Sequence, residues 1–105
     1  MGTAREYRKD IVMTFEEVRT LNKAIIIYGK VSQIDKAIEE MSELTKALLK
    51  KRYNAGSTDD ITEEMADVLI MISQLMLIYD NAEVVEKQME HKIKRLEHKL
   101  LQKNE

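Results

Sequence analysis

The chain contains no cysteine, no proline and no tryptophan, and only three glycines among its 105 residues. The absence of cysteine excludes a disulfide framework and a thiolate metal site. The absence of proline leaves long helices uninterrupted, and glutamate, lysine, leucine, isoleucine and methionine are abundant, as is typical of all-α proteins. We therefore expect one all-α domain over residues 1–105, small enough that a partner subunit would stabilise it.

Long hydrophobic runs and a strong charge imbalance are also missing. The net charge of −2 gives no electrostatic reason to expect a nucleic-acid partner. The most apolar stretch, residues 65–79, is shorter than the ~20 residues of a membrane span and is interrupted by Asp67. The first ten residues are charged and lack the apolar core of a secretory signal. A soluble, cytoplasmic protein without a membrane partner is the expectation.

Hydrophobic periodicity predicts about four helices. Residues 4–28 carry apolar residues three and four apart, and the capping box Thr14-Phe15-Glu16-Glu17 predicts that the firm helix starts there, after a looser leader over 1–13. Gly29 should end this helix. The next helix is expected from about residue 31 or 32 to 52, followed by a tight turn at 53–60 in which Gly56 caps the preceding helix.

The turn makes the second and third helices antiparallel neighbours. Asn81 is expected to cap the last helix, 82–103. Apolar residues in this last helix are spaced like a coiled-coil seam: Val85, Met89, Ile93, Leu96 and Leu100.

Residues 65–79 are apolar nearly all round, which predicts a central, buried helix. Asp67 lies within it and Glu64 one turn earlier on the same face. An ionised carboxylate in such surroundings requires a cation or donors. On the second helix Glu40 and Glu43 lie close enough in height to face this pair, and crowded carboxylates weaken a helix unless a counter-ion is present. We expect Glu64 and Asp67 to hold a positive charge, with Glu40 and Glu43 able to face them.

Carboxylate oxygens without histidine or cysteine favour Mg²⁺, Mn²⁺ or Ca²⁺ over zinc. A helical di-iron site uses Glu-x-x-His pairs, and neither His91 nor His98 has a glutamate three residues earlier, so di-iron is disfavoured.

The pattern Glu39-Glu40-x-x-Glu43, followed after twenty residues by Glu64-x-x-Asp67, resembles the motif of the MazG-like, all-α nucleoside triphosphate pyrophosphohydrolases. The chain is similar to the shorter phage- and Gram-positive-type members over roughly residues 21–99. The similar segments are 28–30, Gln33, 38–44, 64–71 and 92–96.

The resemblance implies a helical bundle completed by oligomerisation as a dimer or tetramer. It further implies Mg²⁺-dependent cleavage, with Mn²⁺ as a substitute, of a nucleoside triphosphate between its α and β phosphates. By the same resemblance Glu40, Glu43, Glu64 and Asp67 are metal ligands and Glu39 is a further ligand or activates the attacking water. Lys92 and Arg95 would contact phosphates, and Gln33 and Asn81 the sugar or base.

Two alternatives stay open. Surface helices are rich in glutamate, so the acidic cluster is also compatible with a non-catalytic helical interaction module, in which it is solvated or paired with lysines of a partner. Without the resemblance, Lys92 and Arg95 would be interpreted as charges that flank a coiled-coil seam. Within the enzyme class, dUTP and damaged nucleotides are candidate substrates, because no residue identifies the base.

Overall fold

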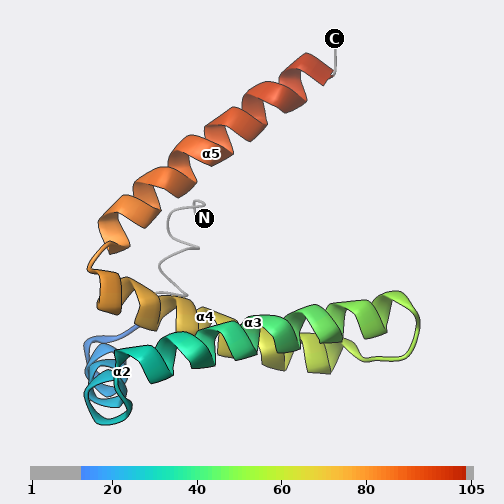
Figure 1. Cartoon of the computed structure of the whole chain (residues 1–105). Helices are drawn as coiled ribbons and strands as arrows, with labels where there is room; N and C mark the ends of the chain where they lie inside the picture. Colours follow the sequence, from blue (N-terminus) through green and yellow to red (C-terminus); the bar gives the residue numbers. More distant parts are fainter. Residues whose placement is uncertain (1–12, 104–105) are drawn as a thin grey trace.

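The computed structural model describes residues 13–103, which form four α-helices and no strand. They are α2 (Phe15–Tyr28), α3 (Lys30–Arg52), α4 (Thr58–Tyr79) and α5 (Ala82–Lys103) (Figure 1). The predicted all-α class with four helices is confirmed. The helical start predicted at residue 4, with most of the leader, lies outside the described residues. None of the described helices is long and apolar enough to cross a membrane.

α2 begins where the capping box predicts. The Thr14 backbone N–H donates to Glu17 Oε1 at 2.9 Å, and the Glu17 N–H donates to Thr14 Oγ1 at 3.2 Å. These bonds from Thr14 lower the pKa of the Glu17 carboxyl, because they favour its charged form. The reciprocal pair fixes the first turn of the helix.

Gly29 joins α2 to α3. Its φ of 92° lies in the region that favours glycine, and its N–H donates to the Ile25 carbonyl at 2.9 Å. Its own carbonyl accepts from the Gln33 N–H at 3.1 Å, so that one residue ends α2 and starts α3. A Cβ here would meet no atom within 4 Å, so the backbone conformation, not space, requires glycine. The predicted end of the first helix is confirmed.

The α3–α4 turn forms as predicted, but Gly56 does not cap α3. Tyr53 is the C-cap and Asn54 takes the left-handed conformation, with φ of 61°. Asparagine tolerates this conformation, which explains why glycine is not needed there. Gly56 instead allows close approach, because a Cβ would lie 3.0 Å from Lys50 Cβ. Ser57 then caps α4 by accepting the Asp60 N–H at 3.1 Å.

α3 and α4 pack side by side, antiparallel, as Figure 1 shows. Their interface holds the best-buried residues, including Ala37 at 1% exposure and Met71 at 6%. α4 contacts each of the other three helices, so its central position is confirmed. Its complete burial is not: large apolar residues on its outer side are well exposed, namely Met65, Leu69, Ile70 and Ile72. α4 is apolar all round, but within one chain it is covered only in part, by α2, α3 and a short contact with α5.

α5 departs from the other helices after Asp80, whose φ of 50° is left-handed. Among the described helices it contacts only α4, and it extends away from them (Figure 1). The radius of gyration, 16.6 Å, therefore exceeds the ~13 Å expected of a compact chain of this length. Asn81 precedes α5 as predicted, and its carbonyl accepts the Val85 N–H at 2.9 Å. The predicted side-chain cap is wrong, because Asn81 Oδ1 is buried and has no hydrogen-bond partner in residues 13–103.

Candidate metal centre

Three carboxylates converge between α3 and α4. Glu40, Glu64 and Asp67 each place one ligand oxygen within 4.8 Å of the others, and all three residues are half-buried. Glu64 and Asp67 share a face of α4 because they are three residues apart, and the antiparallel packing places Glu40 opposite them. The structure thus brings together three of the four metal ligands that the sequence resemblance implied.

The cluster is electrostatically strained around Glu64. Its Oε2 atom is buried and has no hydrogen-bond partner among the described residues. Burial raises the pKa of the Glu64 carboxyl, and the negative charges of Asp67, Glu40, Glu43 and Glu63 raise it further. An orphaned, buried carboxylate oxygen beside two other carboxylates is an environment that a cation would stabilise.

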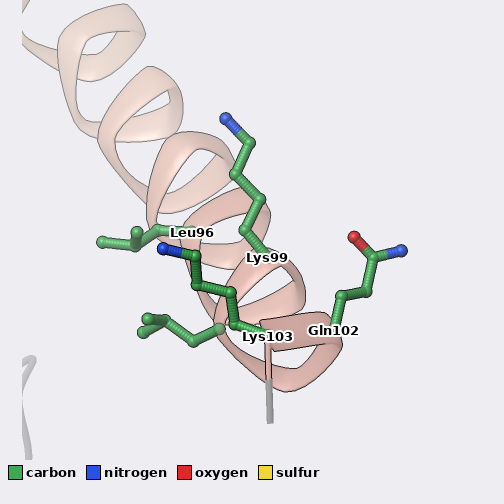
Figure 2. A pocket seen from close by; sticks show the side chains of 5 residues that line it. Leu96, Lys99, Gln102 and Lys103 are labelled. Atoms are coloured by element: carbon green, nitrogen blue, oxygen red, sulfur yellow. The ribbon is translucent and has the colours of Figure 1, made fainter. Parts of the chain in front are cut away.

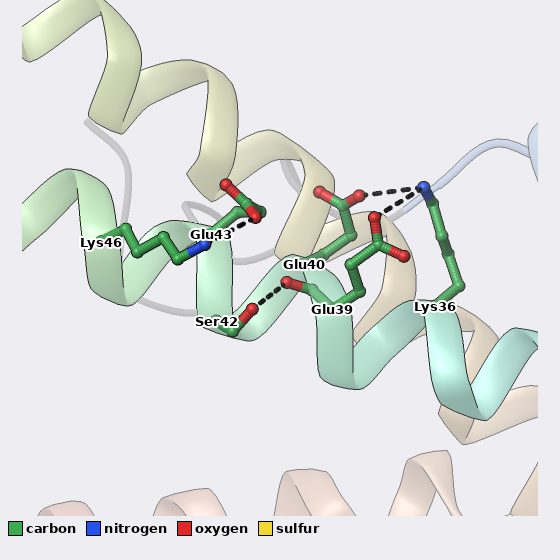
Figure 3. A network of polar contacts seen from close by, with 6 residues as sticks. All are labelled: Lys36, Glu39, Glu40, Ser42, Glu43 and Lys46. Atoms are coloured by element: carbon green, nitrogen blue, oxygen red, sulfur yellow. Dashed lines mark hydrogen bonds and ion pairs between the residues drawn. The ribbon is translucent and has the colours of Figure 1, made fainter.

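One cation of the chain itself reaches the rim of the cluster. Lys36 Nζ lies 3.2 Å from Glu40 Oε1 and 3.8 Å from Glu39 Oε1 (Figure 3). The hydrogen bond to Glu40 is the main cause that raises the pKa of Lys36, with the charges of Glu39, Glu40 and Asp67 adding to it. The interpretation of the sequence assigned Lys36 no role, although its i,i+4 spacing from Glu40 was the available signal.

Glu39 and Glu43 lie outside the group of three. The Glu43 carboxylate pairs with Lys46 Nζ at 3.5 Å, along α3 rather than across to α4 (Figure 3). Glu43 is still near enough to act on the pKa of Glu64. The side chain of Glu39 is 62% exposed and faces Lys36. A metal-ligand role for Glu43 and a water-activating role for Glu39 remain predictions.

Two buried glutamines extend the polar line along the α3–α4 interface. Gln33 precedes Glu40 by seven residues and Gln74 follows Asp67 by seven, so in an antiparallel pair we infer that both lie at one level, about 10 Å from the cluster. Gln33 is 8% and Gln74 3% exposed, and no described residue forms a hydrogen bond with Gln74 Oε1. Gln33 was predicted as a substrate contact. Gln74 was missed, although its spacing continues the Glu64–Asp67 face.

The other predicted substrate contacts are not brought to the carboxylates within one chain. Asn81 lies in the α4–α5 connection, beyond the last turn of α4. Lys92 and Arg95 are exposed on α5, which makes no contact with α3. With Leu96 and Lys99 they line a shallow hollow, and all four of these residues belong to α5. Their predicted contact with phosphates is therefore not tested by this geometry.

Comparisons with known proteins do not assign the chain to a family: no protein-family model, curated protein or solved structure matches it. The class that the fold and site define is an all-α protein with a half-buried cluster of three carboxylates.

Proposed function

We propose that the chain is a Mg²⁺-dependent nucleoside triphosphate pyrophosphohydrolase. The observation that carries this proposal is the convergence of Glu40, Glu64 and Asp67, with an unpartnered, buried oxygen on Glu64. The three side chains offer only hard oxygen ligands, which favour Mg²⁺, Mn²⁺ or Ca²⁺ over zinc. The motif resemblance supplies the reaction class.

In the proposed reaction, a water oxygen adds to the α-phosphorus and the bond from that phosphorus to the α–β bridging oxygen breaks. The products are the nucleoside monophosphate and pyrophosphate. A divalent ion held by Glu40, Glu64 and Asp67 would neutralise phosphate charge and acidify a bound water. Glu39, exposed at the rim, is available to accept the proton of the attacking water.

Lys36 is a cation that α3 places beside the cluster. It neutralises Glu40 when no divalent ion is bound. When Glu40 binds an ion, the Lys36 ammonium is free to contact a phosphate oxygen of the substrate. Gln33 and the neighbouring Gln74 are our candidates for contacts with sugar or base, since both present buried amides on the same interface. Lys92, Arg95 and Asn81 stay predictions from the resemblance.

The test is release of pyrophosphate from a panel of canonical and modified nucleoside and deoxynucleoside triphosphates, with Mg²⁺, with Mn²⁺ and with chelator. Asp67→Asn removes a cluster ligand, whereas Glu63→Gln removes an exposed carboxylate of the same helix and serves as the matched control. We expect metal-dependent release that Asp67→Asn abolishes and Glu63→Gln preserves. Absence of release from every substrate with both metals would refute the enzyme and favour an interaction module.

A further inference from the structure

α5 carries a line of exposed apolar side chains that no described helix covers. Met89 is 44% exposed, and Ile93, Leu96 and Leu100 are each 55% exposed. A shallow hollow beside them is lined by residues of α5 alone, so no other described helix closes it. Figure 2 shows Leu96 and Lys103 on one side of α5 and Gln102 on the opposite side. A helix with such a stripe gains stability by burying it.

The charges along this stripe are arranged by sign. In heptad lettering, Ile93 and Leu100 occupy a and Met89 and Leu96 occupy d. Both g positions of this stretch are lysine, Lys92 and Lys99, and both e positions are glutamate, Glu90 and Glu97. The apolar line thus has one basic flank and one acidic flank.

The flanks determine which partner and which orientation fit. In a parallel pair of helices the g flank of one faces the e flank of the other, so lysine meets glutamate on both sides of the seam. In an antiparallel pair, e faces e and g faces g, so like charges would meet. A β-branched residue at a with leucine at d, as Ile93 and Leu96 provide, favours two strands.

We propose that α5 pairs in parallel with α5 of a second copy of this chain, through the seam Met89, Ile93, Leu96 and Leu100. Lys92 of each copy then lies beside Glu97 of the other. The pairing assigns Lys92 to the seam's flank, the alternative that the sequence left open, and it does not rest on the proposed enzymatic function. Two heptads make a short seam, so the association is concentration-dependent.

Sedimentation equilibrium of the full chain tests the surface. We expect twice the 12.3 kDa chain mass at high concentration and a shift towards 12.3 kDa on dilution. Ile93→Glu places a charge in the seam and should shift the chain to monomer at all concentrations. Leu101→Glu makes the same kind of change at an exposed position outside the seam and should leave the dimer intact. Circular dichroism checks that both variants remain helical, as expected for exposed positions.

Orientation is tested by cross-linking, for which the absence of cysteine provides a clean background. Lys103→Cys occupies the next d position, where a parallel pair brings the two thiols within disulfide distance. Gln102→Cys, one residue away and pointing to the other side, is the matched control. An antiparallel pair would instead join Lys103→Cys to Glu86→Cys when the two variants are mixed.

The proposal holds if the parent chain dimerises, if Ile93→Glu prevents dimerisation and Leu101→Glu does not, and if Lys103→Cys cross-links to itself faster than Gln102→Cys does. A parent chain that is monomeric throughout would overturn it, as would an Ile93→Glu dimer. Preferential cross-linking of the Lys103→Cys and Glu86→Cys mixture would overturn the parallel orientation.

Discussion

Acidic side chains lie both between α3 and α4 and along α5, yet their surroundings differ. On α5, Glu90 and Glu97 stand on one flank of an exposed helix and lysines stand on the other. Between α3 and α4, Glu40, Glu64 and Asp67 point at one another from two packed helices, and the pKa of Glu64 is raised as a result. Spacing along one helix creates flanks, whereas the packing of two helices creates a site.

The largest contrast should appear in metal affinity. Glu40→Gln, Glu64→Gln and Asp67→Asn each remove one carboxylate of the cluster. Each should weaken Mg²⁺ or Mn²⁺ binding by at least about 10- to 100-fold, the loss typical when a residue that supports a metal ligand is removed. Glu39→Gln, exposed at the rim, should change it by less than about fivefold, as for surface charge pairs. Isothermal titration calorimetry with each ion measures both. Equal losses for all four variants would return Glu39 to the ligand set.

Stability should separate the two regions by packing. Ala37→Leu adds three carbons to the α3–α4 interface, where Ala37 is 1% exposed, and should destabilise the fold by about 1–3 kcal/mol. Leu101→Ala on α5, at an exposed position, should change stability by less than about 0.5 kcal/mol. The shift in urea midpoint at unchanged m-value measures each. A neutral Ala37→Leu variant would mean that the two helices are less closely packed than the structure has them.

The pH dependence of stability should expose the strain at Glu64. Because its pKa is higher in the folded chain than in the unfolded chain, the folded state holds a proton more tightly, and this contribution to stability is lost as pH rises through the folded pKa. Without divalent ions, Glu64→Gln should therefore be more stable than the parent chain above that pH. Its stability should not fall with rising pH as that of the parent chain does. Thermal melts of both proteins between about pH 4 and 8, a range that begins near the ordinary pKa of a glutamate, measure this difference in stability. Mg²⁺ should bind more weakly as pH falls, since ligands must be deprotonated.

The smallest expected effect concerns the chain's own counter-ion. Lys36→Met keeps much of the side-chain length and removes the ammonium that pairs with Glu40. Without this competitor, affinity for Mg²⁺ alone should rise by at most about fivefold, the range of an exposed ion pair. Lys46→Met, which removes the partner of Glu43 on the same helix, is the matched control and should have less effect. A weaker affinity in Lys36→Met would indicate that Lys36 organises the cluster.

Much of the helical layout was predictable from sequence because its signals are local. The capping box at Thr14 and the end of α2 at Gly29 follow from backbone groups that neighbouring residues satisfy. The assignment of a helix cap to Gly56 was wrong because asparagine at position 54 can adopt the same left-handed conformation. The prediction that Asn81 caps α5 was wrong because asparagine can cap a helix without its side chain accepting a backbone N–H in every case.

For the candidate site, sequence supplied the carboxylates and structure selected among them. Acidic residues on two predicted helices gave five candidate site residues. The sequence spacing of these residues would be the same whether they bind an ion or face solvent. Only the rotation and level of α3 against α4 separate Glu40, which enters the cluster, from Glu43, whose carboxylate pairs with Lys46. Recognising Lys36 and Gln74 as neighbours of the cluster also required the packing of α3 against α4.

The sequence by itself determined that this chain is helical, approximately where its described helices begin and end, and which faces are apolar or acidic, because these properties depend on residues within a few positions of one another. Tertiary structure alone decided which carboxylates meet, which oxygen is left without a partner, and that α5 keeps its apolar stripe exposed. Those outcomes depend on how separate helices pack, and packing is set by contacts between residues far apart in the chain.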